Sequence, residues 1–228
     1  MARGQTPTLH DVTHLLAPAQ QAGVEIELPW PWGGELFRLP VIRKLTYIVG
    51  PLGSGKTRLA LHLAKVLPNA IFVGLERLEN THATVQMEGN PALRLRVQKT
   101  LAWLLEDGAV MSYSLTSLVT ALEAEGPAFF VIDMVEQGME KRTQQAVSAL
   151  LRRRATCDRP IIMLTRSNVI LDLTAPPSSD ETIIFCPANH SPPIHVEPYS
   201  GSAGYEAVDS CLASPEVRQR TAGVRARW

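Results

Sequence analysis

The sequence predicts an α/β domain in which helices flank a mainly parallel β-sheet. Short runs of β-branched, aromatic and other apolar residues, typical of buried parallel strands, alternate with helical stretches of roughly 10–15 residues. Hydrophobic residues make up 45% of the 228 positions, which is normal for a globular protein. At roughly 150 residues per domain, a chain of this length is expected to form one large domain with a smaller addition.

The order of the elements supports a parallel sheet, because strands that alternate with helices are joined by crossover connections. The strands are expected at residues 36–39, 45–49, 70–73, 129–132, 160–165 and 182–185. The helices are expected at residues 56–67, 91–105, 115–125 and 141–154. In the second of these helices, apolar residues recur at helical spacing along one face.

The two ends of the chain differ from this core. Residues 1–34 are expected to form a helical and aromatic extension, with a helix over residues 8–22 and a rigid Pro- and Trp-rich loop at residues 29–34. Residues 35–186 form the expected α/β core. Because Pro, Gly and Ser cluster after it, residues 187–228 are expected to be irregular, with a short helix.

Composition and charge exclude several classes of protein. The 22 basic residues balance the 22 acidic ones, so no net charge draws the chain to nucleic acid or to anionic lipid. The longest apolar runs are strand-sized, well short of the roughly 18 residues of a membrane span. Three widely spaced cysteines (Cys157, Cys186 and Cys211) do not suggest a disulfide framework. We therefore expect a cytoplasmic protein with no membrane partner.

A phosphate-binding motif stands at the start of the core. Residues 50–57, Gly-Pro-Leu-Gly-Ser-Gly-Lys-Thr, match GxxxxGK[ST], with a buried-type strand before them and a helical pattern after them. Glycines let the backbone amides converge on a phosphate, and the helix points its positive end at the anion. The residues expected to bind a nucleoside triphosphate are Gly50, Pro51, Leu52, Gly53, Ser54, Gly55, Lys56, Thr57 and Arg58.

An acidic residue completes the predicted site. Lys56 is expected to reach the β- and γ-phosphates, and the Thr57 hydroxyl is expected to ligate Mg²⁺. Asp133 ends the apolar run Ala128-Phe-Phe-Val-Ile, at the point where a buried strand meets the loops. A carboxylate in that position accepts hydrogen bonds from water bound to Mg²⁺. The sequence therefore predicts an ATP–Mg²⁺ site made by Thr57 and Asp133 together.

Three segments resemble the ATP-binding cassette ATPases of the RecF/SMC type. They are residues 45–57, residues 132–139 (Ile-Asp-Met-Val-Glu-Gln-Gly-Met) and residues 163–172 (Met-Leu-Thr-Arg-Ser-Asn-Val-Ile-Leu-Asp). The resemblance implies the three-layer fold of P-loop NTPases and an ATPase activity. It also implies a homodimer that sandwiches the nucleotide between its subunits. Such a protein acts as a nucleotide-controlled switch that regulates a protein partner.

The sequence departs from the cassette pattern at two positions. Met134 stands where the family has its catalytic glutamate, and Arg166 where it has the switch histidine. Glu136 is the carboxylate left to position or deprotonate the attacking water. Arg166 is a candidate to stabilise negative charge on the γ-phosphate. The loss of a glutamate at position 134 predicts slow hydrolysis.

A second resemblance leaves other functions open. Residues 71–76 (Ile-Phe-Val-Gly-Leu-Glu) and 131–136 resemble segments of RecA- and DnaB-type motors, in which Glu76 would be the catalytic residue. That comparison implies a ring-shaped oligomer acting on nucleic acid. A small-molecule kinase and a non-hydrolysing nucleotide-binding scaffold are the remaining alternatives.

Overall fold

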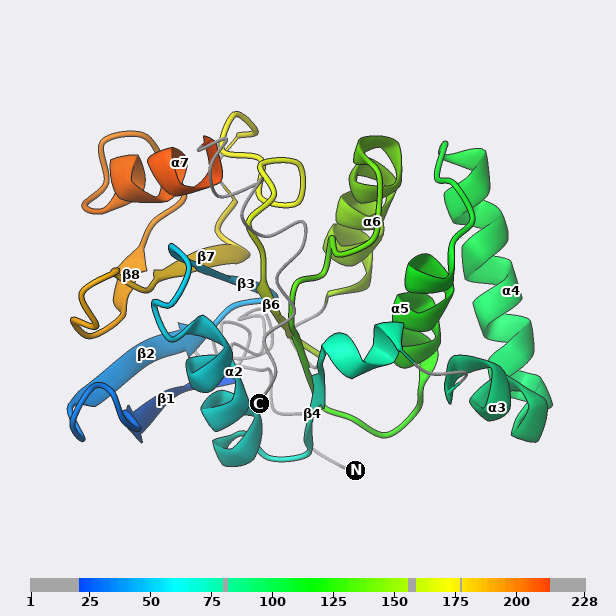
Figure 1. Ribbon diagram of the computed structural model, residues 1–228, viewed down its shortest axis with the longest axis horizontal. Coiled ribbons are helices and arrows are strands. Elements are labelled where there is room, and N and C mark those ends of the chain that lie inside the picture. Colours follow the sequence, from blue (N-terminus) through cyan, green and yellow to red (C-terminus); the bar gives the residue numbers. More distant parts are fainter. Residues whose placement is uncertain (1–20, 80–81, 156–158, 177, 214–228) are drawn as a thin grey trace, which may run out of the picture.

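The computed structural model describes residues 21–79, 82–155, 159–176 and 178–213, arranged in three layers (Figure 1). The middle layer is a six-stranded sheet of order β4-β5-β6-β3-β7-β8. The first five strands of that order pair in parallel, and β8 pairs with β7 in the antiparallel sense. The strands are β3 (Leu45–Val49), β4 (Ala70–Val73), β5 (Phe129–Ile132), β6 (Ile161–Leu164), β7 (Glu181–Phe185) and β8 (Ile194–Val196).

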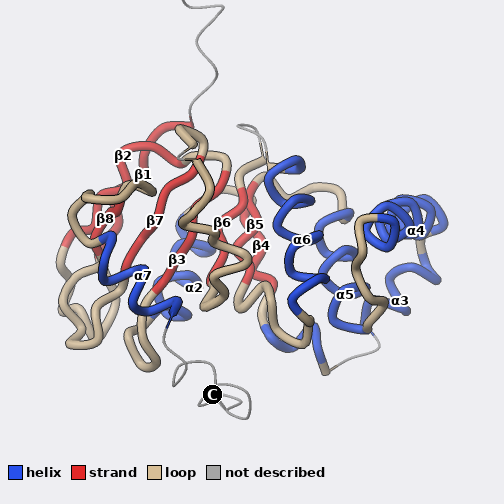
Figure 2. Tube along the Cα trace, turned by 90° about the horizontal axis from the view of Figure 1, so that it is seen from above, coloured by secondary structure: helices blue, strands red, loops and turns tan. Residues whose placement is uncertain are grey.

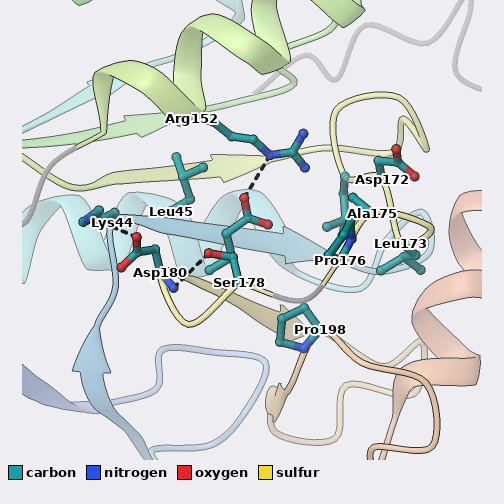
Figure 3. A pocket seen from close by; sticks show the side chains of 12 residues that line it. Lys44, Leu45, Arg152, Asp172, Leu173, Ala175, Pro176, Ser178, Asp180 and Pro198 are labelled. Carbon is teal, nitrogen blue, oxygen red and sulfur yellow. Dashed lines mark hydrogen bonds and ion pairs between the residues drawn. The ribbon is translucent and has the colours of Figure 1, made fainter.

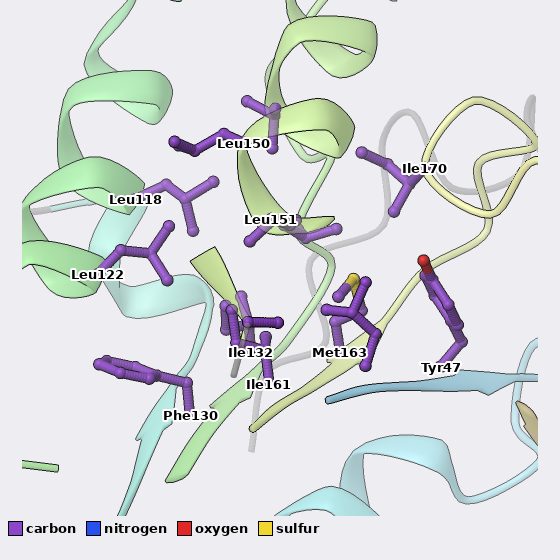
Figure 4. Close-up of a cluster of buried hydrophobic side chains, with 14 of the residues drawn as sticks. Tyr47, Leu118, Leu122, Phe130, Ile132, Leu150, Leu151, Ile161, Met163 and Ile170 are labelled. Carbon is purple, nitrogen blue, oxygen red and sulfur yellow. The ribbon is translucent and has the colours of Figure 1, made fainter. Parts of the chain in front are cut away.

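The central strands are buried on both faces, and side chains therefore alternate between two hydrophobic cores. In β3, Tyr47 belongs to one core and Ile48 to the other. In β5, Phe130 belongs to the first core and Val131 to the second. Figure 4 shows the first core, where side chains of β3, β5 and β6 meet apolar residues of two helices. Burial on both faces explains why these strands have continuous apolar sequences.

Helices and a hairpin cover the two faces of the sheet (Figures 1 and 2). One face carries α2 (Lys56–Val66) and the antiparallel pair β1 (Gln21–Glu27) and β2 (Leu36–Ile42). The other carries α5 (Tyr113–Glu123), α6 (Lys141–Arg154) and α7 (Tyr205–Ala213). Helices α3 (His82–Gly89) and α4 (Pro91–Glu106) pack outside α5. No helix among the described segments has both the length and the apolar character needed to cross a bilayer.

The N-terminal helix prediction was wrong where it can be checked. Most of residues 8–22 lie outside the described residues, but Gln21 and Ala22 belong to strand β1. The cause is a period-two pattern that begins at Val24, with Ile26 and Leu28 buried and the intervening glutamates exposed. β1 pairs with β2 across the expected boundary at residue 34, and the described part of the extension is packed onto the core.

The other predicted elements agree with the structure to within a few residues. Strands β4 and β5 and helix α6 have the predicted bounds, and α7 is the short helix expected near the C-terminus. Sequence patterns did not reveal α3, the one-turn helix η1 (Leu75–Leu78) or β8. These three elements are short, and β8 follows a proline-rich loop, so none of them contains enough residues to establish a period.

Helix α2 positions the phosphate loop, and its packing can be tested by one substitution. Leu63 is fully buried in the second core, whereas Leu61 on the same helix is 38% exposed. We expect Leu63→Ala to lower the free energy of unfolding by about 2–5 kcal/mol. Leu61→Ala should lower it by only about 0.5 kcal/mol. Urea unfolding of both variants measures the difference, and equal losses would contradict the assigned packing of α2.

Candidate functional site

The phosphate loop connects the end of β3 to the start of α2, at the carboxyl edge of the sheet. Gly53 and Gly55 adopt left-handed φ angles of 79° and 88°, which a side chain disfavours. Gly55 lies at the N-cap of α2, so the following amides are directed out of the helix end. The local sequence thereby produces a turn of the kind that binds an anion with backbone N–H groups.

Two aromatic side chains support this loop from outside. Trp32 is buried, and its ring atoms lie 2.6 Å from the point that a Cβ atom on Gly55 would occupy. Its indole N–H donates to the carbonyl oxygen of Ser191 (3.1 Å). The His190 ring lies 2.9 Å from the carbonyl oxygen of Gly53. The segment after β7 and the Trp-rich loop before β2 therefore hold the phosphate loop in place, a role that the sequence did not show.

Arg58, which was predicted to contact the nucleotide, is directed toward Trp30. Its guanidinium lies 4.4 Å from the centre of the Trp30 ring and donates to the Trp30 carbonyl oxygen (3.3 Å). Trp30 is 71% exposed, in contrast to Trp32. The assignment of Arg58 to the nucleotide remains a prediction.

Lys56 is buried within the loop that it is expected to serve. Its ammonium group donates to the carbonyl oxygens of Gly50 (2.7 Å) and Pro51 (2.5 Å), and it lies 3.3 Å from the Ser54 hydroxyl. Burial, and after it the charge of Arg166, lowers the pKa of Lys56 to about 8. A buried ammonium group surrounded by carbonyl oxygens still lacks a full counter-charge, and a phosphate would supply one.

Thr57 and Asp133 meet as predicted. The Thr57 hydroxyl donates to Oδ2 of Asp133 across 3.3 Å, which joins the start of α2 to the end of β5. Asp133 is 5% exposed, and its Oδ1 atom has no hydrogen-bond partner among the described residues. Burial raises the pKa of Asp133, against the hydrogen bond from Thr57 and the nearby Arg77, Lys56 and Arg166 charges, which lower it. A hydroxyl beside an unpartnered carboxylate oxygen is a donor set that suits Mg²⁺.

Glu136 lies between the ends of β5 and β6. Its Oε2 atom accepts a hydrogen bond from the Thr165 hydroxyl (2.9 Å), and Oε1 accepts one from the backbone N–H of Arg166 (2.8 Å). Burial raises the pKa of Glu136, and these hydrogen bonds oppose the increase. Both carboxylate oxygens therefore hold the end of β6, which lies next to β3 in the sheet.

Arg166 and Glu76 occupy different surroundings. The half-buried Arg166 interacts electrostatically with Lys56, Asp133 and Glu136, and its Nε atom has no partner in the described part of the chain. Glu76 instead folds back on its own loop, where it accepts a hydrogen bond from the N–H of Gly74 (3.0 Å). It follows β4, which β5 and β6 separate from β3. The structure thus brings Arg166 and Glu136 toward the phosphate loop and leaves Glu76 at the edge of the sheet.

A separate pocket lies at the amino-terminal ends of β3 and β7, away from the phosphate loop (Figure 3). Ion pairs line its wall: Lys44 with Asp180 (2.7 Å) and Arg152 with Glu181 (2.9 Å). The charges within each pair neutralise one another, and the carboxylate of Asp172, which also lines the pocket, accepts hydrogen bonds from Thr174.

Comparisons with known proteins support the fold. No protein-family model matches the chain, and no curated protein matches it. Among solved structures, a bacterial Atm1-family ABC exporter with ATP bound matches with a TM-score of 0.55 at 13% identity. That match covers 92% of this chain but only 44% of the exporter chain. An ATP-binding cassette of an ABC transporter in its ADP conformation also matches, with a TM-score of 0.47 and 16% identity, over 84% of this chain and 92% of that one.

The predicted fold class is confirmed: the chain has a three-layer α/β P-loop NTPase fold with a mainly parallel sheet. The identities are too low to show more than the fold. The finer resemblances to RecF/SMC proteins and to RecA- and DnaB-type motors, and the roles of individual site residues, remain predictions.

The contact between Trp32 and Gly55 predicts unequal effects of two alanine substitutions. Gly53→Ala strains the backbone alone, at about 1–2 kcal/mol, because nothing lies near the new methyl group. Gly55→Ala adds a collision with the Trp32 ring. We expect the Gly55 variant to be the less stable of the two in thermal unfolding and to lose nucleotide affinity. Equal stability of the two variants would show that Trp32 does not pack against Gly55.

The lowered pKa of Lys56 predicts a pH dependence of ATP binding. A phosphate binds the protonated ammonium form, so affinity should fall as pH rises through about 8. The fall should approach roughly tenfold per pH unit. Calorimetric titrations between about pH 7 and 9.5 measure it. Lys56→Arg is the control, because arginine stays charged over that range. A flat profile for the unmodified protein would contradict the assignment.

Proposed function

We propose that the chain binds ATP together with Mg²⁺ at residues 50–57 and hydrolyses it slowly. The observation that carries the proposal is the buried Oδ1 atom of Asp133, beside the Thr57 hydroxyl, which has no hydrogen-bond partner within the described segments. An uncompensated carboxylate oxygen in a buried site is costly unless a ligand satisfies it. The adjacent turn supplies anion-binding amides, so a cation and a polyphosphate would satisfy the two halves of the site together.

Each residue has a separate task in this proposal. The amides after Gly53 and at the start of α2 would bind phosphate oxygens, and Lys56 would contribute a positive charge. Thr57 and Asp133 would hold the Mg²⁺, which neutralises charge on the phosphates when bound. Arg166, whose charge interacts with those of Lys56 and Asp133, would add a second positive charge for the terminal phosphate.

We infer slow turnover from the two side chains that could have activated water, those of residues 134 and 136. Met134 cannot take a proton from water, and Glu136 uses each of its oxygens to hold β6. A general base must lie within hydrogen-bond reach of the attacking water, and Glu136 is buried at the end of β6. Met134, together with the hydrogen bonds that Glu136 already accepts, also favours a second candidate function. This is a nucleotide-binding scaffold that does not hydrolyse ATP.

An exposed apolar surface supports association as the output of the proposed switch. Large apolar side chains are exposed where α4 passes to α5: Leu105, Val110, Met111 and Tyr113. The backbone N–H of Val110 donates to the Thr143 hydroxyl at the start of α6 (2.9 Å). We propose that this surface meets a second copy of the chain, as the cassette resemblance implies, and that ATP controls the contact. Regulation of a further protein partner belongs to the same proposal.

Calorimetry with ATP, in the presence and absence of Mg²⁺, tests the binding step. The unmodified protein should bind ATP, and Lys56→Met should lose roughly 10- to 100-fold in affinity, as expected for a charge-assisted hydrogen bond. Asp133→Asn keeps the shape of the side chain but should lose the increase in affinity that Mg²⁺ provides. Absence of binding by the unmodified protein would overturn the proposal.

Two further measurements separate the candidate functions. Phosphate release that Asp133→Asn abolishes would support an ATPase, and no release from a protein that binds ATP would support the scaffold. Molar mass measured with ATP, with ADP and without nucleotide tests association. A dimer that forms only with ATP is expected, whereas a ring or an unchanging monomer would contradict the proposed switch.

A further inference from the structure

Arg77 is a buried arginine that no sequence motif identified. It lies in η1, directly after β4, and is only 8% exposed. A buried guanidinium must find acceptors for its five N–H groups. The acceptors of Arg77 are backbone carbonyl oxygens, and two of them belong to Asp133 and Met134.

The guanidinium links the ends of two neighbouring strands. Nη1 donates to the carbonyl oxygens of Gly74 and Asp133, each at 2.8 Å, and Nη2 donates to that of Met134, also at 2.8 Å. The regular pairing of β4 with β5 ends just before, where the N–H of Asp133 donates to Val73 (2.9 Å). Arg77 therefore continues the connection between the strands beyond the last backbone hydrogen bond.

The turn held by Arg77 has an unfavourable backbone conformation. Met134 has a φ angle of 45°, in the left-handed region that residues with side chains seldom adopt. Its carbonyl oxygen accepts hydrogen bonds from Arg77 and from the N–H of Gln137 (2.9 Å). Together with the bond from Arg77 to the Asp133 carbonyl oxygen, these bonds hold the peptides on both sides of Met134. They thereby hold the backbone from which the Asp133 side chain leaves the strand.

Arg77 is itself anchored, and its charge acts on the same group. The Ser117 hydroxyl of α5 donates to the Arg77 carbonyl oxygen (2.8 Å). The positive charge of Arg77 is one of the influences that lower the pKa of Asp133 against the effect of burial. Lysine would supply the charge but not the planar fork that reaches both carbonyl oxygens.

We propose that Arg77 is a positioning residue for the magnesium site. Through the carbonyl oxygens of residues 133 and 134, it aims the Asp133 carboxylate at the Thr57 hydroxyl. The inference rests on the proposed function, because it concerns the same ATP–Mg²⁺ site. Arg77 touches neither nucleotide nor metal in this proposal, and acts only through Asp133 and Met134.

Calorimetric titration with ATP over a series of Mg²⁺ concentrations tests the inference in Arg77→Met and Arg77→Lys. Affinity without Mg²⁺ should stay unchanged, because the phosphate loop is intact. Mg²⁺ is expected to increase the affinity for ATP. The Mg²⁺ concentration that gives half of this increase should rise roughly 10- to 100-fold in Arg77→Met, as is typical when a residue that holds a metal ligand is lost. Arg77→Lys should show a smaller increase.

Arg96 offers a matched control, since it is another arginine that donates to a backbone carbonyl oxygen and whose Nε has no partner among the residues that the structure describes. Its contacts are with Glu123 and Glu125 at the end of α5. Arg96→Met should therefore lower thermal stability without altering the Mg²⁺ requirement. An unaltered requirement in the folded Arg77 variants would overturn the inference.

A second substitution provides a rescue that a general loss of stability would not show. Glycine adopts the left-handed conformation of residue 134 without strain. Adding Met134→Gly to Arg77→Lys should therefore restore part of the lost Mg²⁺ affinity, and no recovery would contradict the role assigned to the turn. If Arg77→Met does not fold, the lysine variant with and without Met134→Gly decides the question.

These outcomes are distinct from failure of the proposed function. If the unmodified protein binds no nucleotide, the proposed function fails and the inference fails with it. If the unmodified protein shows Mg²⁺-dependent binding and the Arg77 variants match it, only the role of Arg77 is overturned.

Discussion

The contact between Thr57 and Asp133 is the interaction on which the rest of the site depends. It joins the first turn of α2 to the end of β5, two strands away from β3 in the sheet. Both side chains can meet only if the order of the strands, the start of the helix and the direction of Asp133 are all set correctly. The hairpin, Trp32 and His190 support the loop on one side of this contact, and Arg77 supports the strand end on the other.

The site concentrates buried charge in a way that does not favour stability by itself. Lys56, Asp133, Glu136 and Arg77 are each at most 9% exposed, and the half-buried Arg166 lies among them. Desolvation costs roughly several kcal/mol for each such ion unless its partners compensate fully. Compensation here is incomplete, since Oδ1 of Asp133 and the Nε atoms of Arg77 and Arg166 have no partner among the described residues. The charged ligand of the proposed function would supply the missing partners and offset this cost.

The sequence alone predicted the parts of the site that can be recognised from the residues next to them in the chain. The phosphate loop has a fixed spacing between a strand and a helix, and Asp133 ends a run of apolar residues, so both were predictable. Trp32, His190 and Arg77 were not, because their partners are 159, 137 and 56 positions away along the chain. Glu76 and Glu136 looked alike in sequence, as each follows an apolar run that predicts a buried strand. Only the order of the strands distinguishes them, because β4 lies at the edge of the sheet.

The positions of Met134, Glu136 and Arg166 explain one another in physical terms. Met134 has a left-handed φ angle, and its carbonyl oxygen accepts a hydrogen bond from Arg77. Two residues later the chain places Glu136 under β6, where its carboxylate receives the Arg166 N–H and the Thr165 hydroxyl. The Glu136 carboxylate is therefore buried and holds the backbone of Arg166 in place. Under the proposed function, Glu136 would hold the Arg166 charge for the terminal phosphate and would not activate water. The site would then favour tight binding of a polyphosphate over its rapid hydrolysis.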